Sequence, residues 1–399
     1  LLKVAPLSAS LHEERPYPAL KNIMKIVFTG GGTGGHFYPI IAVAEEINNI
    51  AKEQKLLTPQ LYYIAPEKYD ARALYENNII FKKSPAGKVR RYFSIWNLID
   101  KFKTGIGVIK ATLQLFTIYP DVVFSKGGYA SFPTVFAAKI LRIPVIIHES
   151  DAVPGRVNKW AGKFARKIAV SYPEAITYFE KGKVAFTGNP VRKELFTLAN
   201  EGAHEYLKLE KEIPTLLILG GSQGAKRIND TVMEALPKLV EKYQIIHQTG
   251  KKNFEEIKST ARVILEGTQY GHRYKPFGFL NTLAMRMSGG ASNLVVSRGG
   301  ASAIFEIAIW GLPSIIVPIA DSNGDHQRKN AFTYARSGAA VVIEEKNFTP
   351  NLLASEIDRL LSDKELTKKM KDATKEFARP DAARKIAEGI IATALKHEE

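Results

Sequence analysis

The 399-residue sequence contains no cysteine, which excludes disulfides, cysteine-ligated metals and thiol catalysis and fits a reducing compartment. It also lacks an apolar run of the roughly 18 residues that a membrane-spanning helix requires. The longest candidate, residues 104–119, is interrupted by Lys110 and Gln114. Residues 1–23 lack the apolar segment of a secretory signal, so we expect a disordered leader before a true start at Met24.

Several binding signatures are missing as well. There is no GKS or GKT phosphate loop, and the glycines of residues 30–35 do not fit the dinucleotide spacing with its acidic partner, which disfavours a dehydrogenase. No D-x-D pair ends a strand and no His or Cys cluster occurs; Asp321 and Asp325 stand alone in a polar loop. We therefore predict no metal ligands and no cofactor.

Acidic residues are scarce relative to basic ones. The sequence has 56 Lys and Arg against 40 Asp and Glu, a formal net charge of +16. This excess indicates an anionic partner: nucleic acid, a membrane surface or a phosphorylated substrate. No nucleic-acid-binding motif is present and the basic residues are scattered over helices, so we do not expect nucleic acid. A content of 45% hydrophobic and 24% charged residues is typical of a globular protein, here long enough for two domains.

Glycine turns are the features that the sequence does have. Residues 30–35 follow the apolar run 26–28 and precede a helical pattern that includes Pro39. Without side chains in the turn, an anionic or hydroxylated ligand can approach the backbone and the positive end of the helix. One such turn could be purely structural. Three more follow apolar strands, at residues 126–131, 220–225 and 297–301.

The strand, glycine turn and helix recur about 190 residues after the first copy. This repetition predicts an α/β fold of two Rossmann-like doubly wound domains, with turns at the carboxyl edges of the sheets. We place the boundary after the TGNP stretch. The domains are then residues 24–190 and 191–378, followed by an amphipathic C-terminal helix in residues 379–399 that packs on a neighbouring surface.

Three side chains are candidates for chemistry, although each also has a purely structural interpretation. His36 either caps backbone at the first turn or takes a proton near pH 7. Glu306 either pairs with a basic residue or accepts hydrogen bonds from ribose hydroxyls. Arg192 either forms an ordinary ion pair or holds phosphate with its planar fork.

Residues 88–103 interleave aromatic and aliphatic side chains with five basic residues and a single acid. The segment is either a helix lying in a membrane interface or a core helix with a solvated basic face. The side chains that would contact the membrane in the first case are Arg90, Arg91, Tyr92, Phe93, Trp96 and Phe102.

Seven motifs occur in order across residues 24–335: GGGTGGHFYP, KGGYASFP, HESDAVPGRVNK, TGNPVR, GGSQGA, SRGGASAIFEI and GDHQRKNA. Together they resemble the MurG family, whose members add N-acetylglucosamine to lipid I. The resemblance implies the GT-B architecture of two Rossmann-like domains facing across a cleft, with the last helix crossing back to the first domain. It also favours the membrane interpretation of residues 88–103, since the family docks on the bilayer through its first domain. The protein would then be peripheral, on the cytoplasmic face of the cell membrane.

The resemblance further implies the reaction and the residues involved. The donor would be UDP-N-acetylglucosamine, and the acceptor the 4-hydroxyl of the muramyl sugar of undecaprenyl-linked lipid I, giving lipid II for peptidoglycan synthesis. Transfer would invert the anomeric centre, with His36 as the general base. By motif position, Ser222 and Gln223 lie at the diphosphate, Leu280 at the uracil and Glu306 at the ribose. The other expected substrate-binding residues are Thr33, Gly34, Gly35, Asp151, Arg192 and Gln327.

One position departs from the family pattern. Asp151 follows His148-Glu149-Ser150 where the family usually has asparagine, and a carboxylate only accepts hydrogen bonds whereas an amide also donates them. Rival assignments of the same architecture are a glycolipid glycosyltransferase and a UDP-N-acetylglucosamine 2-epimerase, which fold alone does not separate.

Overall fold

A computed structural model describes residues 23–87, 96–221, 224–320 and 322–396. Nearly all of the expected leader lies outside the described residues. So do Arg90, Arg91, Tyr92, Phe93, Ser222, Gln223 and the side chain of Trp96.

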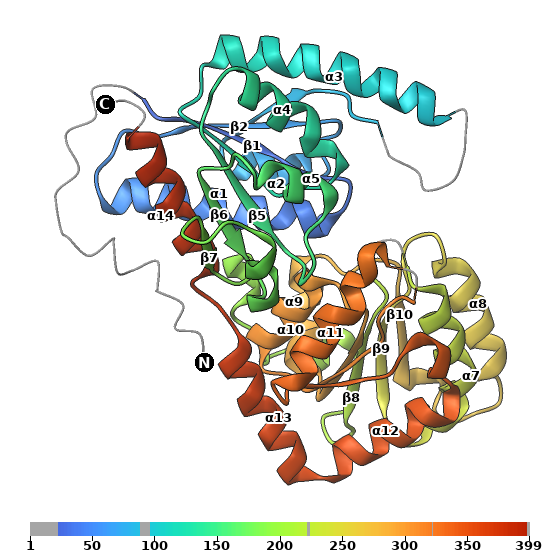
Figure 1. The fold of residues 1–399 in the computed structure, drawn as a ribbon. Coiled ribbons are helices and arrows are strands. Elements are labelled where there is room, and N and C mark those ends of the chain that lie inside the picture. The colour runs from blue at the N-terminus through green and yellow to red at the C-terminus, as the bar shows by residue number, and fades with distance from the viewer. Residues whose placement is uncertain (1–22, 88–95, 222–223, 321, 397–399) are drawn as a thin grey trace. The chain divides into compact units, whose positions relative to one another are not determined.

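The first compact unit ends at Pro190 and includes the chain again from Asp381. Its sheet is parallel, in the order β3-β2-β1-β4-β5-β6-β7 (Figure 1). The strands are β1 Lys25–Thr29, β2 Gln60–Ala65, β3 Ile79–Lys83, β4 Val122–Ser125, β5 Val145–Glu149, β6 Lys167–Val170 and β7 Val184–Phe186. The helices are α1 Gly34–Glu53, α2 Ala71–Glu76, α3 Trp96–Ile118, α4 Phe132–Ile140, α5 Arg156–Ala161 and α14 Ala382–Leu395.

The second unit, Val191–Pro380, contains a parallel sheet in the order β10-β9-β8-β11-β12-β13. Its strands are β8 Thr215–Leu219, β9 Gln244–Gln248, β10 Tyr274–Phe277, β11 Leu294–Ser297, β12 Ser314–Ile316 and β13 Ala340–Val342. Its helices are α6 Ala203–Leu207, α7 Lys226–Lys242, α8 Phe254–Ile264, α9 Thr282–Ala291, α10 Ala301–Trp310, α11 His326–Arg336, α12 Pro350–Ser362 and α13 Lys364–Phe377. The two parallel sheets covered by helices confirm the predicted fold class.

Both sheets reverse their strand order at an equivalent place. In the first sheet the switch lies between β1 and β4, and in the second between β8 and β11. Ligands of open α/β sheets bind at such switch points, beyond the carboxyl ends of the strands. The four predicted glycine turns follow these four strands, so the topology brings the turns together in pairs.

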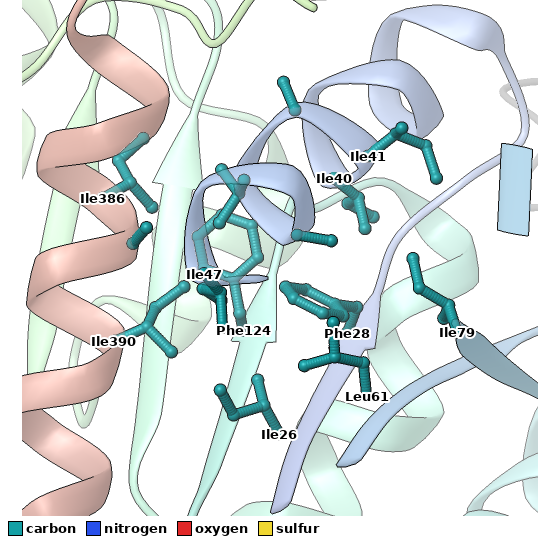
Figure 2. Packing of buried hydrophobic residues seen from close by; sticks show 14 of the residues in the cluster. Ile26, Phe28, Ile40, Ile41, Ile47, Leu61, Ile79, Phe124, Ile386 and Ile390 are labelled. Carbon is teal, nitrogen blue, oxygen red and sulfur yellow. The ribbon is translucent and has the colours of Figure 1, made fainter. Parts of the chain in front are cut away.

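Alternating side chains of the first sheet enter two different cores, because successive residues of a strand point to opposite faces. Ile26 and Phe28 of β1 pack with α1 and α14, whereas Val27 packs with α3, α4 and α5. Figure 2 shows Ile386 and Ile390 of α14 among the side chains of the first core. The last helix therefore belongs to the first unit.

Hydrogen bonds and ion pairs at its surface also hold α14 on α1. Arg384 donates two hydrogen bonds to the carboxylate of Glu53, at 2.6 and 3.1 Å, and lies 3.3 Å from Glu388. A fork-to-carboxylate pair of this kind fixes orientation more than a single contact does.

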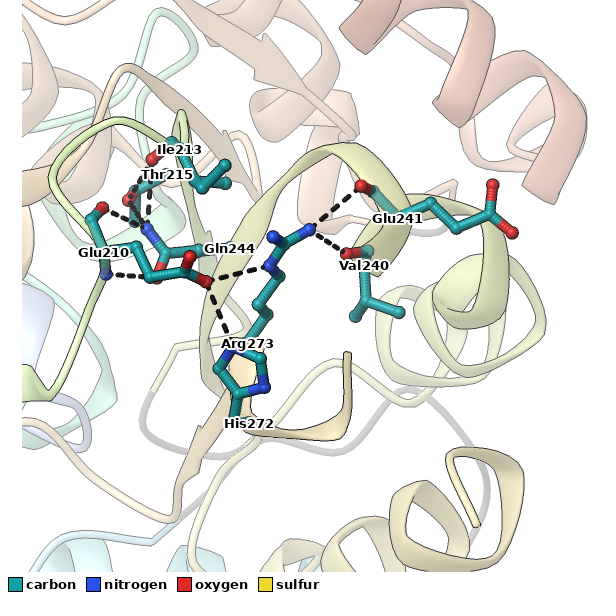
Figure 3. Close-up of polar contacts among 8 residues, drawn as sticks. All are labelled: Glu210, Ile213, Thr215, Val240, Glu241, Gln244, His272 and Arg273. Carbon is teal, nitrogen blue, oxygen red and sulfur yellow. Dashed lines mark hydrogen bonds and ion pairs between the residues drawn. The ribbon is translucent and has the colours of Figure 1, made fainter. Parts of the chain in front are cut away.

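The segment around Glu210, which leads into β8 of the second unit, is held by the polar contacts in Figure 3. The side chain of Gln244 accepts from the amide of Glu210 and donates to its carbonyl, both at 2.7 Å. Arg273 donates to Glu210 and to the carbonyls of Val240 and Glu241 at the end of α7. Cations at a helix C-terminus satisfy carbonyls that have no partner within the helix.

Some element boundaries differ from the sequence pattern. Helix α1 begins at Gly34, so His36 lies in its first turn and not in the loop before it. Strand β12 ends at Ile316, although the apolar pattern continues to Ile319. Pro318 has no N–H to donate to a neighbouring strand, which explains the early end.

Candidate functional site

The first glycine turn is shaped by its crowded surroundings. Gly30, Gly31 and Gly32 all have positive φ, and a Cβ on Gly31 would lie 2.9 Å from the Tyr63 hydroxyl. That hydroxyl donates to the carbonyl of Gly30 at 2.7 Å. Helix α1 has no acidic residue in its first turn, and Thr33 at its N-cap provides no side-chain cap. The positive end of α1 therefore suits an anionic or hydroxyl-rich ligand.

His36 lies at this helix start, next to the turn that follows β4. Its Nδ1 is 3.3 Å from the carbonyl oxygen of Lys126, so this nitrogen carries the proton and donates. Its Nε2 is close to Gly128, where an added Cβ would be 3.5 Å away. In this tautomer Nε2 is the nitrogen that can accept a proton, as a general base requires.

A polar cluster surrounds the side chain of Lys126, whose carbonyl contacts His36; of its members the sequence analysis predicted only Asp151 as a site residue. We define the Lys126 cluster as Lys126, His148, Glu149, Ser150, Asp151, Asn158 and Asn189. Lys126 is 1% exposed, and its ammonium contacts His148 Nδ1 at 2.6 Å, Asn189 Oδ1 at 3.0 Å and the Ser150 hydroxyl. All seven members lie in the quoted motifs KGGYASFP, HESDAVPGRVNK and TGNPVR, but no motif indicates that they meet around a buried lysine.

Burial sets the protonation of this cluster. It lowers the pKa of Lys126 to about 7, while the Glu149 and Asp151 carboxylates act in the opposite direction. Burial, together with the nearby Asp151 charge, raises the pKa of Glu149 to about 7. Burial and the Lys126 charge hold the pKa of His148 well below its usual range, and its Nε2–H donates to the carbonyl of Gly188 at 3.0 Å.

The second unit presents two more helix starts. Gly221 and Gly224, which flank the part of the GGSQGA turn outside the described residues, both have positive φ. Helices α7 and α10 carry no acidic residue in their first turns, and their N-caps, Ala225 and Gly300, provide no side-chain cap. Both helix starts are therefore suited to a phosphate group.

Glu306 lies on α10 in the electrostatic field of Arg192. Burial raises the pKa of Glu306 to about 7, and the Arg192 guanidinium opposes this shift. Arg192 is 15% exposed at its side chain and donates to the Thr282 hydroxyl at 3.2 Å. The structure therefore brings Arg192 and Glu306, far apart in sequence, to one place in the second unit.

Gln327 lies at the start of α11, against the turn after β11. Its side-chain oxygen accepts from the amide of Ile319 at 3.2 Å. A Cβ on Gly299 would lie 2.5 Å from the backbone oxygen of Gln327. The turn is also held by Arg298, which pairs with Glu345 at 2.6 Å.

Leu280 is 2% exposed, and its side chain belongs to the core between the second sheet and its helices. Its amide donates to the side chain of Gln248 at 3.3 Å. A ligand would therefore meet the backbone at this position rather than the leucine side chain.

No group of three or more His, Asp or Glu side chains that could hold a metal ion occurs within the described ranges. Among the described residues, no helix has the length and apolar character needed to cross a bilayer.

Comparison with known sequences gives two family matches. Residues 26–170 match the Glycosyltransferase family 28 N-terminal domain, and residues 215–386 match the Glycosyltransferase family 28 C-terminal domain. The chain belongs to glycosyltransferase family 28. Within the family it is similar to enzymes named UDP-N-acetylglucosamine--N-acetylmuramyl-(pentapeptide) pyrophosphoryl-undecaprenol N-acetylglucosamine transferase. The relative from Treponema denticola is 36% identical and the alignment covers 85% of this chain and 87% of the relative. A relative from Bacillus cereus is 36% identical, covering 92% and 99%.

Solved structures agree on the family 28 fold. Acinetobacter baumannii MurG is 25% identical, with a TM-score of 0.68 over 92% of this chain and 99% of that one. A UDP-GlcNAc 2-epimerase from Neisseria meningitidis has a TM-score of 0.65 at 15% identity, covering 94% and 100%. The epimerase likeness shows the fold alone, so the sequence relatives separate the transferase from its rival.

We expect the close approach of Gly299 to Gln327 to be needed for the family 28 fold of the second unit. Gly299→Ala places a methyl group against backbone that has no flexible end to move, so α11 must shift. Gly300→Ala is the matched control, because a Cβ there meets nothing within 4 Å. Thermal unfolding should show a midpoint several degrees lower for Gly299→Ala, by a cost of about 1–3 kcal/mol, and little change for Gly300→Ala. Equal midpoints for the two variants would contradict the tight contact.

Proposed function

We propose that this N-acetylglucosaminyltransferase moves N-acetylglucosamine from UDP-N-acetylglucosamine to the 4-hydroxyl of the muramyl sugar in undecaprenyl-linked lipid I. The observation that carries the proposal is the similarity, over most of the chain, to relatives that are named for this donor and acceptor. The product would be lipid II, used for peptidoglycan synthesis.

The second unit is proposed to bind the donor. The start of α7, with Ser222 and Gln223, would bind the diphosphate, and Arg192 and Gln327 would help to hold it. Glu306 would accept hydrogen bonds from the ribose hydroxyls, and the backbone at Leu280 would contact uracil. Support comes from the acid-free helix starts at two strands of the switch point and from the arginine beside Glu306.

The first unit is proposed to supply the base. His36 Nε2 would remove the proton of the acceptor hydroxyl while its oxygen bonds to the anomeric carbon of the donor. The bond from that carbon to the diphosphate oxygen breaks at the same time, and UDP leaves with the electron pair, which inverts the anomeric centre. Thr33, Gly34 and Gly35 are proposed to contact the sugars, because they lie at the same switch point as His36. Asp151, which follows β5 at the same edge of the sheet, is also proposed to contact substrate.

An apolar face of α3 is proposed to dock on the cytoplasmic surface of the membrane. Its exposed side chains are spaced three or four residues apart, so they form one stripe: Leu98, Phe102, Ile106, Ile109, Leu113 and Phe116. Phe102 and Phe116 are 72% and 71% exposed. Exposed lysines at 101, 103 and 110 accompany the stripe, and Asp100 is the one acid in α3. Such a helix suits an anionic bilayer interface.

The reaction is tested by transfer of labelled N-acetylglucosamine to a lipid I analogue, with and without EDTA. We expect product from the wild type and a loss of about 100-fold or more in His36→Ala, because the base is removed. Lys163→Ala, at an exposed position of the same unit, is the control and should keep full activity. If the wild type epimerises or hydrolyses the donor and makes no transfer product, the assignment of lipid I as the acceptor is wrong. Full activity in His36→Ala would show that another group acts as the general base.

Donor binding should depend on pH through Glu306. Its pKa of about 7 means that the carboxyl is mostly neutral at about pH 6 and ionised at about pH 8. An ionised carboxylate is the better acceptor for two hydroxyls, so we expect UDP-N-acetylglucosamine to bind up to about tenfold more tightly at the higher pH. Calorimetry of Glu306→Gln, which does not titrate, should give weaker binding with a flat profile. If donor affinity changes with pH in the same way in both proteins, Glu306 does not bind the ribose.

Membrane docking should depend on the apolar stripe of α3. Ile109→Glu combined with Leu113→Glu should reduce sedimentation with phosphatidylcholine–phosphatidylglycerol vesicles by about tenfold or more, because two exposed aliphatic side chains that would enter the bilayer are replaced by charged ones. Val263→Glu is the matched control, since Val263 and Ile109 are both 65% exposed. Vesicles of phosphatidylcholine alone should bind the wild type more weakly. Equal binding of the double variant and the wild type would exclude this face.

A further inference from the structure

A buried cation and two carboxyl groups meet at the carboxyl edge of the first sheet. The Lys126 side chain leaves the end of β4 and reaches His148 and Ser150 at the end of β5 and Asn189 beyond β7. Its three N–H donors thus meet three neutral acceptors. Hydrogen bonds are satisfied in this way, but the charge of the ammonium still needs an anionic neighbour in so buried a place.

Glu149 is the first anionic group of the cluster and is 4% exposed. Its carboxylate accepts from the amides of Asp151 and Gly155, both at 3.0 Å, and from the Asn158 side chain at 2.9 Å. These bonds hold the backbone on both sides of Asp151. Asp151, partly buried, is the second anionic group and follows directly on Ser150, which accepts from Lys126.

The charge of the Lys126 cluster depends on which members are present. A protonated Lys126 and an ionised Asp151 cancel each other's charge, whatever the state of Glu149. Removing the lysine alone leaves the Asp151 charge without its buried counter-charge, and neutralising Asp151 alone leaves the ammonium without one. Removing both charges restores the balance. The cluster should therefore tolerate the double change better than the single loss of lysine.

We propose that Lys126 is a positioning residue whose positive charge allows a carboxylate to stand at position 151, so that Lys126 and Asp151 act as a matched pair. The backbone of Lys126 links this pair to the chemistry, because its carbonyl accepts from His36 Nδ1 at 3.3 Å. Gly127 and Gly128 follow directly, with a Cβ on Gly127 calculated 2.6 Å from Asn158. Disturbing the charge pair thus moves the turn against which His36 rests. The part of the inference that concerns catalysis rests on the proposed function.

The test is a double-mutant cycle of Lys126→Met and Asp151→Asn, measured at about pH 6, where Lys126, with its pKa of about 7, is mostly charged. Thermal unfolding is the first readout and needs no activity. We expect Lys126→Met to lower the midpoint, and Asp151→Asn to raise it more in the Lys126→Met background than in the wild type. Lys163→Met, at an exposed position, is the control. Additive shifts would overturn the matched pair.

Transfer to the lipid I analogue is the second readout. We expect Lys126→Met to lower kcat by about tenfold or more with the donor KM little changed, and the double variant to recover to within about threefold of the wild type. A lysine that only braces the strands would give no such recovery, and that result would also overturn the proposal. If the wild type transfers nothing, the proposed function fails, and the unfolding cycle alone decides the pair.

Discussion

The parallel pairing of β1 with β4, and of β8 with β11, is the constraint on which the candidate site depends. In the first sheet Thr29 is opposite Ser125, so the Gly30 turn and the Lys126 turn leave the sheet side by side. In the second sheet Leu219 is opposite Ser297, which brings the turns after β8 and β11 together in the same way. Each pair of neighbouring strands is thereby followed by helix starts with no acidic residue in the first turn, at the point where the strand order reverses.

Glycine is required in these turns for two reasons: neighbouring atoms leave no room for a side chain, and a ligand can approach the bare backbone. Gly31 is close to the Tyr63 hydroxyl and Gly299 to the backbone of Gln327, so neither position has room for a Cβ. The same contacts fix the turns, since Tyr63 donates to Gly30 and Asn330 donates to Gly299. A rigid turn keeps its backbone donors aimed in one direction, which is the preorganisation that binding a diphosphate or a developing charge needs.

The sequence was sufficient for the fold because its signals are local. Apolar runs, glycine turns and helix starts follow each other within about ten residues, and their recurrence after Pro190 indicates the second domain. His36 and Glu306 could be singled out because a motif surrounds each. The apolar stripe was only half predicted: Lys110 and Gln114 interrupt the linear pattern after residue 103, but on a helix they lie off the line that joins Phe102, Ile109 and Phe116.

The Lys126 cluster could not be predicted because its members come from four separate segments and meet only in the folded sheet. Lys126 opens one of the quoted motifs, but the motif does not show that the lysine is buried, because its burial depends on β5 and on the segment after β7. This has a consequence for Asp151. Compared with the asparagine that the family usually has at this position of the motif, Asp151 adds one negative charge. Counted together with Lys126, its charge is balanced by the ammonium, so the pair adds no more net charge beside Glu149 than two uncharged residues would. The role of a site residue carried over from relatives therefore has to be judged with the buried charges around it.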